Sequence, residues 1–214
     1  MDNRIIFNKL LATLLLFSLS MFYVATTKAD EAGSGEPQVI VKKSTEEMLQ
    51  ALKDNEVELE QDPSIIFGLV ESIIMPHFDF DKMAKLALGK NWRKVSAEQK
   101  LQFTEEFRLL LIRTYSTAML EYTDEEIKFL PVRGELAKKK VKVPMEIIQA
   151  GGPPIPMALA MYLNKKGVWK VYDVKIDGIS LVTNYRSTFA TQIRNEGMDK
   201  LIETLAKKNE KVII

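Results

Sequence analysis

Cysteine is absent from this chain of 214 residues, and histidine occurs once, at His77. The lack of cysteine excludes disulfides, thiolate nucleophiles, zinc–thiolate sites and a lipid-modified N-terminal cysteine. The fold must therefore depend on its apolar core, and 46% of the residues are hydrophobic, which is enough to form one. An excess of one charge is also missing, because 30 basic and 29 acidic residues leave a formal net charge of +1. A chain this close to neutrality has no general attraction for nucleic acid, so nucleic acid is not an expected partner.

Long apolar runs are also scarce, and the one that stands out lies near the N-terminus, from Leu10 to Val24. Its 15 residues fall short of the roughly 20 that a membrane-spanning helix needs. Arg4 and Lys9 precede the run, and Thr27 and Ala29 place small residues at the usual −3 and −1 positions of a cleavage site. These features predict a cleavable export signal that ends at Ala29, rather than an uncleaved membrane anchor.

The remaining chain has the length of one domain. Removing the first 29 of the 214 residues leaves 185 and takes away three basic residues and one acidic residue, which brings the formal net charge from +1 to −1. Residues 30–38 are polar and contain Gly33 and Gly35, so we predict a flexible leader there. Residues 39–210 are predicted to form a single domain.

Helical patterns dominate up to about residue 122. Ser44 with Glu47, and Ser96 with Gln99, have the spacing of a capping box, so each serine is predicted to begin a helix. Pro63 predicts a further helix start, and the helix that begins at Ser96 is expected to be the longest.

Strand-like composition then replaces the helical pattern in four segments, at about 126–132, 138–149, 155–164 and 168–177. Their short connections predict an antiparallel meander, and two helices separated by Gly197 follow it. The predicted class is therefore α+β: N-terminal helices, a curved four-stranded antiparallel sheet, and C-terminal helices that enclose an apolar pocket.

Residues able to perform catalysis or bind a metal are few. His77 with Asp79 and Asp81 is a weak metal-binding pattern, and the alternative is a helix end followed by a new N-cap at either aspartate. Asp173 and Asp177 lie two pleats apart on or beside the last strand, which favours a structural role. No metal and no cofactor are expected. The alternative function left open is a small enzyme that acts on an apolar substrate, with Asp173 or His77 as its base.

Apolar side chains form the candidate binding site instead. Several are methionines, whose flexible side chains suit variable apolar ligands, although periodicity alone favours an ordinary solid core. The candidate residues are Leu111, Tyr115 and Met119 on the long helix, Val143, Met145, Met157, Leu159, Met161, Val174 and Ile176 on the strands, and Leu181, Tyr185 and Phe189 on the later helix.

The segment 171–189, VYDVKIDGISLVTNYRSTF, resembles the signature of the MlaC/toluene-tolerance family. The resemblance extends over roughly residues 40–210, which is nearly all of the mature chain. Further matches are PHFDF at 76–80, LGKNW at 88–92, Gln99 with Phe103, and Thr114 with Tyr115.

Members of this family are soluble periplasmic proteins that carry phospholipid. The resemblance implies a shuttle between an outer-membrane lipoprotein/porin complex and an inner-membrane ABC transporter complex with its substrate-binding subunit, which maintains the lipid asymmetry of the outer membrane. It also implies that acyl chains lie between sheet and helices, that the headgroup stays near solvent, and that no catalysis occurs. The candidate apolar residues would then line the lipid site, and His77 would belong to a structural block.

Arg186 is expected to have a structural role. It lies about 100° around its helix from Tyr185, and so away from the apolar stripe. We predict that it forms an ion pair with Asp173 or Asp177 and does not bind a lipid phosphate.

The export signal makes a direct prediction. When the full chain is produced in a Gram-negative host, N-terminal sequencing of the protein from the periplasmic fraction should begin at Asp30, because cleavage follows Ala29. A sequence that begins at Met1 in the membrane fraction would contradict it.

Overall fold

The computed structural model describes residues 36–121, 126–132, 139–149 and 152–211. The predicted export signal and the first part of the predicted leader lie outside these residues. Across the described ranges, no helix combines the length and the hydropathy that crossing a bilayer requires.

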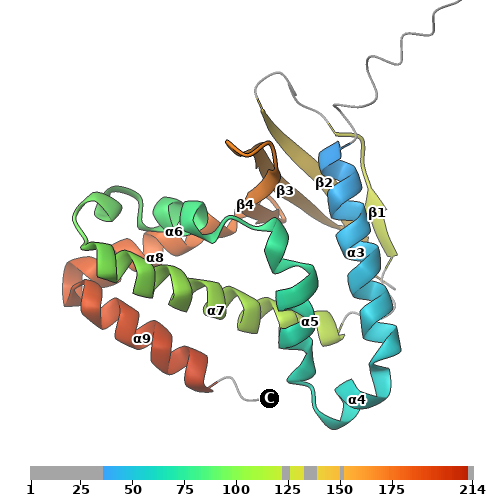
Figure 1. Ribbon diagram of the computed structural model, residues 1–214, viewed down its shortest axis with the longest axis horizontal. Coiled ribbons are helices and arrows are strands. Elements are labelled where there is room, and N and C mark those ends of the chain that lie inside the picture. The colour runs from blue at the N-terminus through green and yellow to red at the C-terminus, as the bar shows by residue number, and fades with distance from the viewer. Residues whose placement is uncertain (1–35, 122–125, 133–138, 150–151, 212–214) are drawn as a thin grey trace, which may run out of the picture. The chain divides into compact units, whose positions relative to one another are not determined.

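The N-terminal half is helical, as predicted, and the first strand comes after residue 121 (Figure 1). The elements are α3 (Glu36–Asp54), α4 (Glu56–Gln61), α5 (Ile65–Ile73), the 3₁₀ helix η1 (Met75–His77), α6 (Phe80–Leu88), the 3₁₀ helix η2 (Gly89–Arg93) and α7 (Ala97–Glu121). With 25 residues, α7 is longer than any other helix of the described residues, which confirms that expectation.

One predicted helix start is confirmed and another is wrong. The amide of Ser96 donates to the side chain of Gln99 at 3.0 Å, and the amide of Gln99 donates to the Ser96 hydroxyl at 3.1 Å, so this capping box forms. Ser44, however, lies inside α3, where its hydroxyl donates to the Val41 carbonyl at 3.0 Å. The helix begins earlier because Pro37 is compatible with a first turn, and residues 36–38 of the predicted leader are helical.

Within the described residues the sheet contains five strands instead of the predicted four. They are β1 (Glu126–Phe129), β2 (Lys140–Ile148), β3 (Ile155–Leu163), β4 (Trp169–Ile176) and β5 (Ile179–Ser180), paired antiparallel in this order. The short fifth strand forms because Asp177 and Gly178 have φ values of +49° and +77°, as a tight two-residue hairpin turn requires. An Asp-Gly pair is a recognised signal for such a turn, so the sequence contained this information.

The register of β3 on β4 shifts between Ala160 and Met161. Ala160 pairs with Asp173 whereas Met161 pairs with Val171, so Tyr172 is an extra residue in β4, as in a β-bulge.

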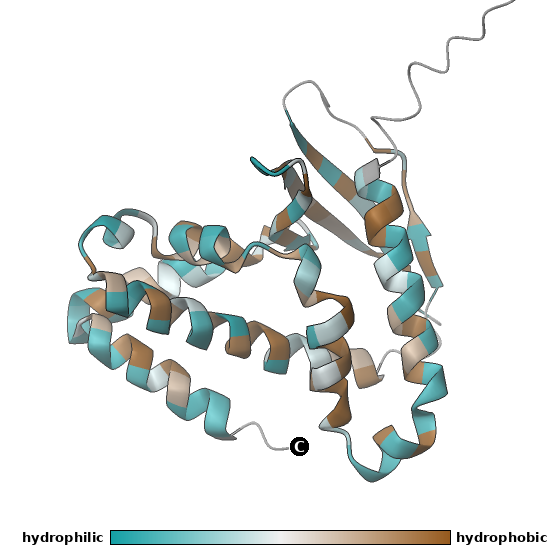
Figure 2. Cartoon of the chain, viewed as in Figure 1, coloured by the Kyte–Doolittle hydropathy of each residue, from teal (hydrophilic) through white to brown (hydrophobic). Residues whose placement is uncertain are grey.

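Helices contact the sheet at its two flanks. On one side α3 packs against β2, and on the other η1, α6 and α8 (Leu181–Glu196) pack against β4. The helix α9 (Met198–Lys211) packs on α7 and α8. Figure 2 shows α5 hydrophobic along most of its length, which fits its packing against both α3 and α7, with Ile66 and Val70 buried.

Asp79 joins α6 to the sheet. Its carboxylate caps α6 by accepting from the Lys82 amide at 2.9 Å, and it also accepts from the Tyr162 hydroxyl of β3. Its own amide donates to the Val171 carbonyl of β4 at 2.9 Å. Burial, together with the Asp79 carboxylate, raises the pKa of Tyr162 to about 12. The N-cap interpretation of Asp79 is thereby confirmed.

Arg186 does not form the predicted ion pair. Its Nε donates to the Leu86 carbonyl at 2.7 Å, near the end of α6. Its side chain packs on Gly89, where a Cβ atom would lie 3.2 Å from the Arg186 Cδ. The prediction is wrong because Asp173 is buried and accepts from the Val182 amide at 3.2 Å, while Asp177 belongs to the β4–β5 turn.

The structural role of Arg186 remains testable. Arg186→Ala removes a charged donor from a helix-terminal carbonyl and should lower the free energy of unfolding by about 1 kcal/mol. Urea denaturation measures this change, and Arg194→Ala, at an exposed position in the last turn of the same helix, is the control. Equal losses in both variants would contradict a specific role for the Leu86 contact.

Candidate functional site

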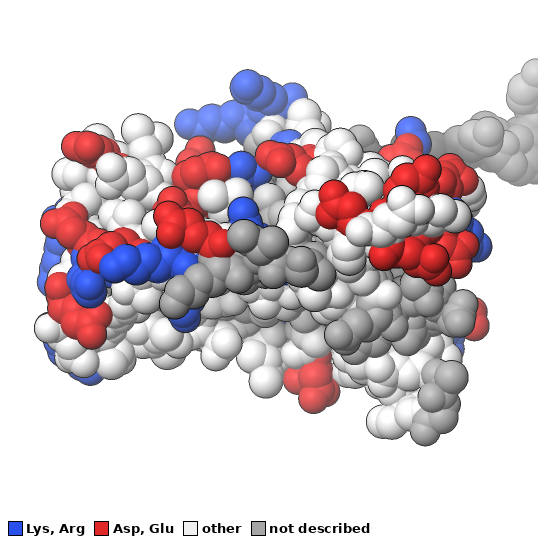
Figure 3. Space-filling model, turned by 90° about the horizontal axis from the view of Figure 1, so that it is seen from below, with Lys and Arg blue, Asp and Glu red and all other residues white. Residues whose placement is uncertain are grey.

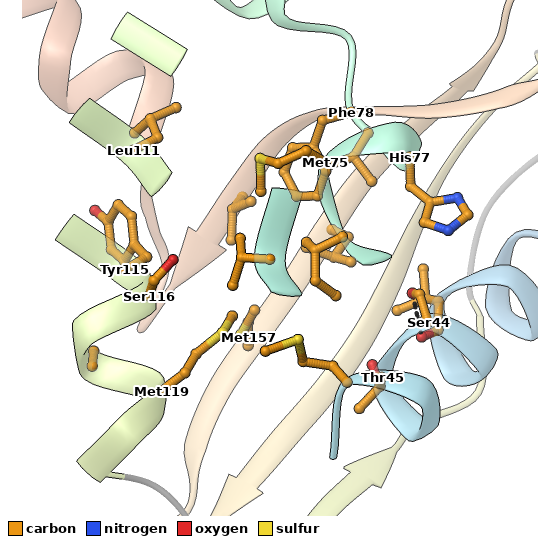
Figure 4. Close-up of a pocket in the computed structure, with 18 of the residues that line it drawn as sticks. Ser44, Thr45, Met75, His77, Phe78, Leu111, Tyr115, Ser116, Met119 and Met157 are labelled. Atoms are coloured by element: carbon orange, nitrogen blue, oxygen red, sulfur yellow. Dashed lines mark hydrogen bonds between the residues drawn. The ribbon is translucent and has the colours of Figure 1, made fainter. Parts of the chain in front are cut away.

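A cavity of about 430 Å³ lies between the inner face of the sheet and the helices α3, α5, α6 and α7 (Figure 4). Most of its lining is apolar. The polar side chains in its wall are Ser44, Thr45, His77, Tyr115 and Ser116. Among the described residues that line it, none is Asp, Glu, Lys or Arg. The cavity can therefore hold an apolar ligand, and its described lining offers no charge to balance an ionic group.

Charged side chains lie outside this described lining, and many of them are exposed on the surface. Figure 3 shows acidic side chains gathered over α4, where Glu56, Glu58 and Glu60 are exposed. None of these glutamates lines the cavity.

Nine of the thirteen candidate residues line the cavity. Their convergence follows from the strand register, in which Met145 pairs with Met157 and Leu159 pairs with Val174. The nine are Leu111, Tyr115, Met119, Met145, Met157, Leu159, Val174, Ile176 and Leu181.

Val143 and Met161 do not reach the cavity. Both are 0% exposed and belong to a cluster of buried side chains that includes Val141, Trp169 and Val41. They share the inner face with the lining residues, but their side chains are fully packed in this cluster and leave no space beside them. The alternation along a strand identifies which side chains point to the inner face of the sheet, but it does not show whether they meet a cavity or other side chains.

Tyr185 and Phe189 also lie elsewhere. Their rings pack against Phe107 of α7, with centroids 5.2 and 5.6 Å away, and Phe189 meets Phe103 at 5.3 Å. The apolar stripe of α8 beyond its first turn is therefore a contact surface for α7. This cluster forms the core of the helical layer.

The hydroxyls of Tyr115 and Tyr185 are hydrogen-bonded to each other across this layer. Burial raises the pKa of Tyr115 to about 12, and the neighbouring Tyr185 adds to the effect. Tyr115 is therefore neutral at physiological pH and adds no charge to the cavity wall.

Lining residues from α3 and α5 were not among the candidates. They include Met48 and Leu52 of α3, and Val70 of α5. A signal for α5 was present, because Val70 lies on the apolar stripe of this helix and such a stripe ordinarily faces the interior. No comparable signal marks Ser116 or Thr45, which are polar residues in helices.

His77, at the end of η1, faces the cavity without an acid–base partner in its wall. Burial lowers the pKa of its imidazole, and the nearby charge of Lys170 lowers it further. Asp173, the other base considered, does not line the cavity and is engaged with the α8 N-terminus. Within the described ranges, no group of three or more His, Asp or Glu residues is placed to hold a metal ion.

Fold and cavity together define a class: an α+β protein with an apolar cavity between an antiparallel sheet and its helices, whose described lining carries no Asp, Glu, Lys or Arg. The chain belongs to the MlaC family, since the family described as MlaC protein matches residues 42–207. The resemblance inferred from the sequence is confirmed.

Two relatives extend over most of the chain. The intermembrane phospholipid transport system binding protein MlaC of Haemophilus influenzae is 26% identical over 204 residues, which cover 94% of each chain. The toluene tolerance protein ttg2D of Pseudomonas putida is 29% identical over 192 residues, covering 88% of this chain and 86% of that protein.

A solved structure has the same fold. The phospholipid-binding protein of Ralstonia solanacearum, determined in complex with a phospholipid, superimposes with a TM-score of 0.74. The two are 28% identical, and the match covers 82% of this chain and 97% of that one.

The difference between hollow and solid parts of the sheet can be tested by stability. Met161→Glu would bury an unpaired carboxylate in packed core and should lower the free energy of unfolding by on the order of 4 kcal/mol. Met157→Glu places the same group beside a cavity that can admit water, so its loss should be much smaller. Circular dichroism and thermal unfolding measure both, and equal destabilisation would contradict the assignment of the two positions.

Proposed function

We propose that this protein is a soluble periplasmic carrier of phospholipid that buries the acyl chains in the cavity. The observation that carries the proposal is the uncharged apolar cavity, within a fold that a relative uses to hold a phospholipid. Residues 39–210 would form one phospholipid-binding domain.

The physical requirement of a carrier matches this cavity. Burying a methylene group contributes about 0.8 kcal/mol, so two acyl chains together are held strongly only where water is excluded along their length. A phosphate inside would lack a counter-charge, since the described lining contains no Lys or Arg. The headgroup is therefore expected at the mouth, in contact with water.

The same energetics explain why partners are needed. A lipid held by many methylene groups leaves slowly unless another protein opens the cavity or accepts the chains. The proposed partners are an outer-membrane lipoprotein/porin complex and an inner-membrane ABC transporter complex with its substrate-binding subunit. The relative from Haemophilus influenzae is the binding protein of an intermembrane phospholipid transport system, and this chain covers 94% of it.

The proposed role is transport that maintains the lipid asymmetry of the outer membrane, without catalysis. An enzyme would need a general base and a reacting centre near each other. His77 is the one side chain in the described lining whose ordinary pKa lies near neutral pH, and the charged groups that influence it, Lys170, Glu47 and Lys43, lie outside that lining.

The proposal predicts bound lipid. Protein purified from the periplasmic fraction should show an adduct of phospholipid mass by native mass spectrometry. Met157→Glu should reduce the adduct about a hundredfold or more, because its carboxylate would lie against acyl chain.

A matched control is available on the surface of α7, where Leu101 is 72% exposed. Leu101→Glu makes the same chemical change outside the cavity and should leave the adduct unchanged. A wild-type protein that carries no lipid and takes none up from vesicles would contradict the proposed function.

A further inference from the structure

The hydroxyl of Ser116 is unusual among the polar groups of the cavity. Ser116 is 0% exposed, and its Oγ has no hydrogen-bond partner among the described residues. Figure 4 shows the hydroxyl directed from α7 toward the cavity. A buried donor without a partner is unfavourable, and such a group calls for an explanation.

Several other hydroxyls within helices of this protein behave differently. Thr104 of α7 is also buried without a partner, but it does not line the cavity. A serine or threonine inside a helix ordinarily donates to a carbonyl one turn back. Thr117, the next residue, donates to Arg113 at 3.0 Å, and Ser44, across the same cavity, donates to Val41 at 3.0 Å. Ser72 donates to Gly68 at 2.9 Å. Ser116 departs from this pattern, so its hydroxyl remains available to a ligand.

The surroundings of Ser116 restrict the ligand atom that could accept this bond. Its neighbours on the same helix face are Ile112 and Met119, and the described wall of the cavity has no acidic or basic side chain. For His77, also in the wall, burial lowers the pKa of the imidazole and so favours its neutral form. An anionic acceptor such as a phosphate or a free carboxylate would therefore lack a counter-charge, which favours a neutral oxygen.

We infer that the Ser116 hydroxyl donates a hydrogen bond to an ester carbonyl of the bound lipid, and that the cavity therefore prefers ester-linked to ether-linked chains. The inference rests on the proposed function, because ester carbonyls are the neutral acceptors where acyl chains join the glycerol of a phospholipid. Ser116 is thus a specificity residue: it distinguishes lipids by the linkage of their chains and not by the headgroup.

The test is a competition between lipids that differ only in this linkage. Delipidated protein is incubated with vesicles containing diacyl and dialkyl-ether forms of phosphatidylglycerol and phosphatidylethanolamine, all with the same chain lengths. Native mass spectrometry then gives the ratio of ester to ether lipid bound. Wild-type protein should favour the ester form about fivefold to tenfold, which is the effect of one net hydrogen bond.

Two variants separate the inferred bond from general effects. Ser116→Ala removes only the hydroxyl and should bring the ratio close to 1, while the melting temperature of the delipidated protein should not fall, because no protein partner is lost. Thr117→Val removes a neighbouring hydroxyl that is already paired and does not line the cavity, so it should keep the wild-type ratio.

The outcomes are distinct. Equal binding of ester and ether lipids by the wild-type protein, or an unchanged preference in Ser116→Ala, would overturn the inference while leaving the carrier function intact. Failure of the wild-type protein to bind any of the four lipids would overturn the proposed function and this inference with it.

Discussion

The cavity depends on the attachment of Phe78 and Asp79 to strand β4. Phe78 pairs with Val171 as an isolated parallel bridge, and the Asp79 amide donates to the Val171 carbonyl. This attachment fixes η1 and α6 at one flank of the sheet, while α3 packs on β2 at the other. Because the helices are held at the two flanks, the inner face of the sheet between them is left partly uncovered. The cavity lies over this uncovered part.

Much of the architecture followed from local patterns, and the failures share a physical cause. Capping spacing at Ser96 and alternation along the strands depend on neighbouring residues, so they could be read directly from the sequence. Whether an inward side chain meets a cavity or another side chain depends on residues distant in sequence. Met157 and Met161 have the same pattern and different surroundings, because Met161 belongs to a cluster of fully packed side chains whereas Met157 lines the cavity. Similarly, the period of α8 identified its apolar stripe but not that most of it faces α7.

Polar groups show the same division between what is local and what is not. Ser44 satisfied the capping spacing, yet a helix that begins earlier places it in the interior of α3. Ser116 carried no motif at all, and its importance comes from the absence of a partner in three dimensions. In both cases the identity of the residue was informative only after the surrounding backbone was known.

The extra residue in β4 affects how the helices α6 and α8 are attached to the sheet. A regular strand exposes every second side chain on a given face, but the bulge supplies two successive side chains, Tyr172 and Asp173, that do not line the cavity. Tyr172 and Tyr162 lie beneath the ammonium group of Lys82 on α6, and Asp173 binds the first turn of α8. One strand thus anchors two helices at adjacent positions. Deleting either Tyr172 or Asp173 would leave the alternation of the inward-facing side chains of β4 intact, but it would remove the contact of β4 with one of the two helices. We therefore expect this segment to tolerate a substitution far better than a change in length.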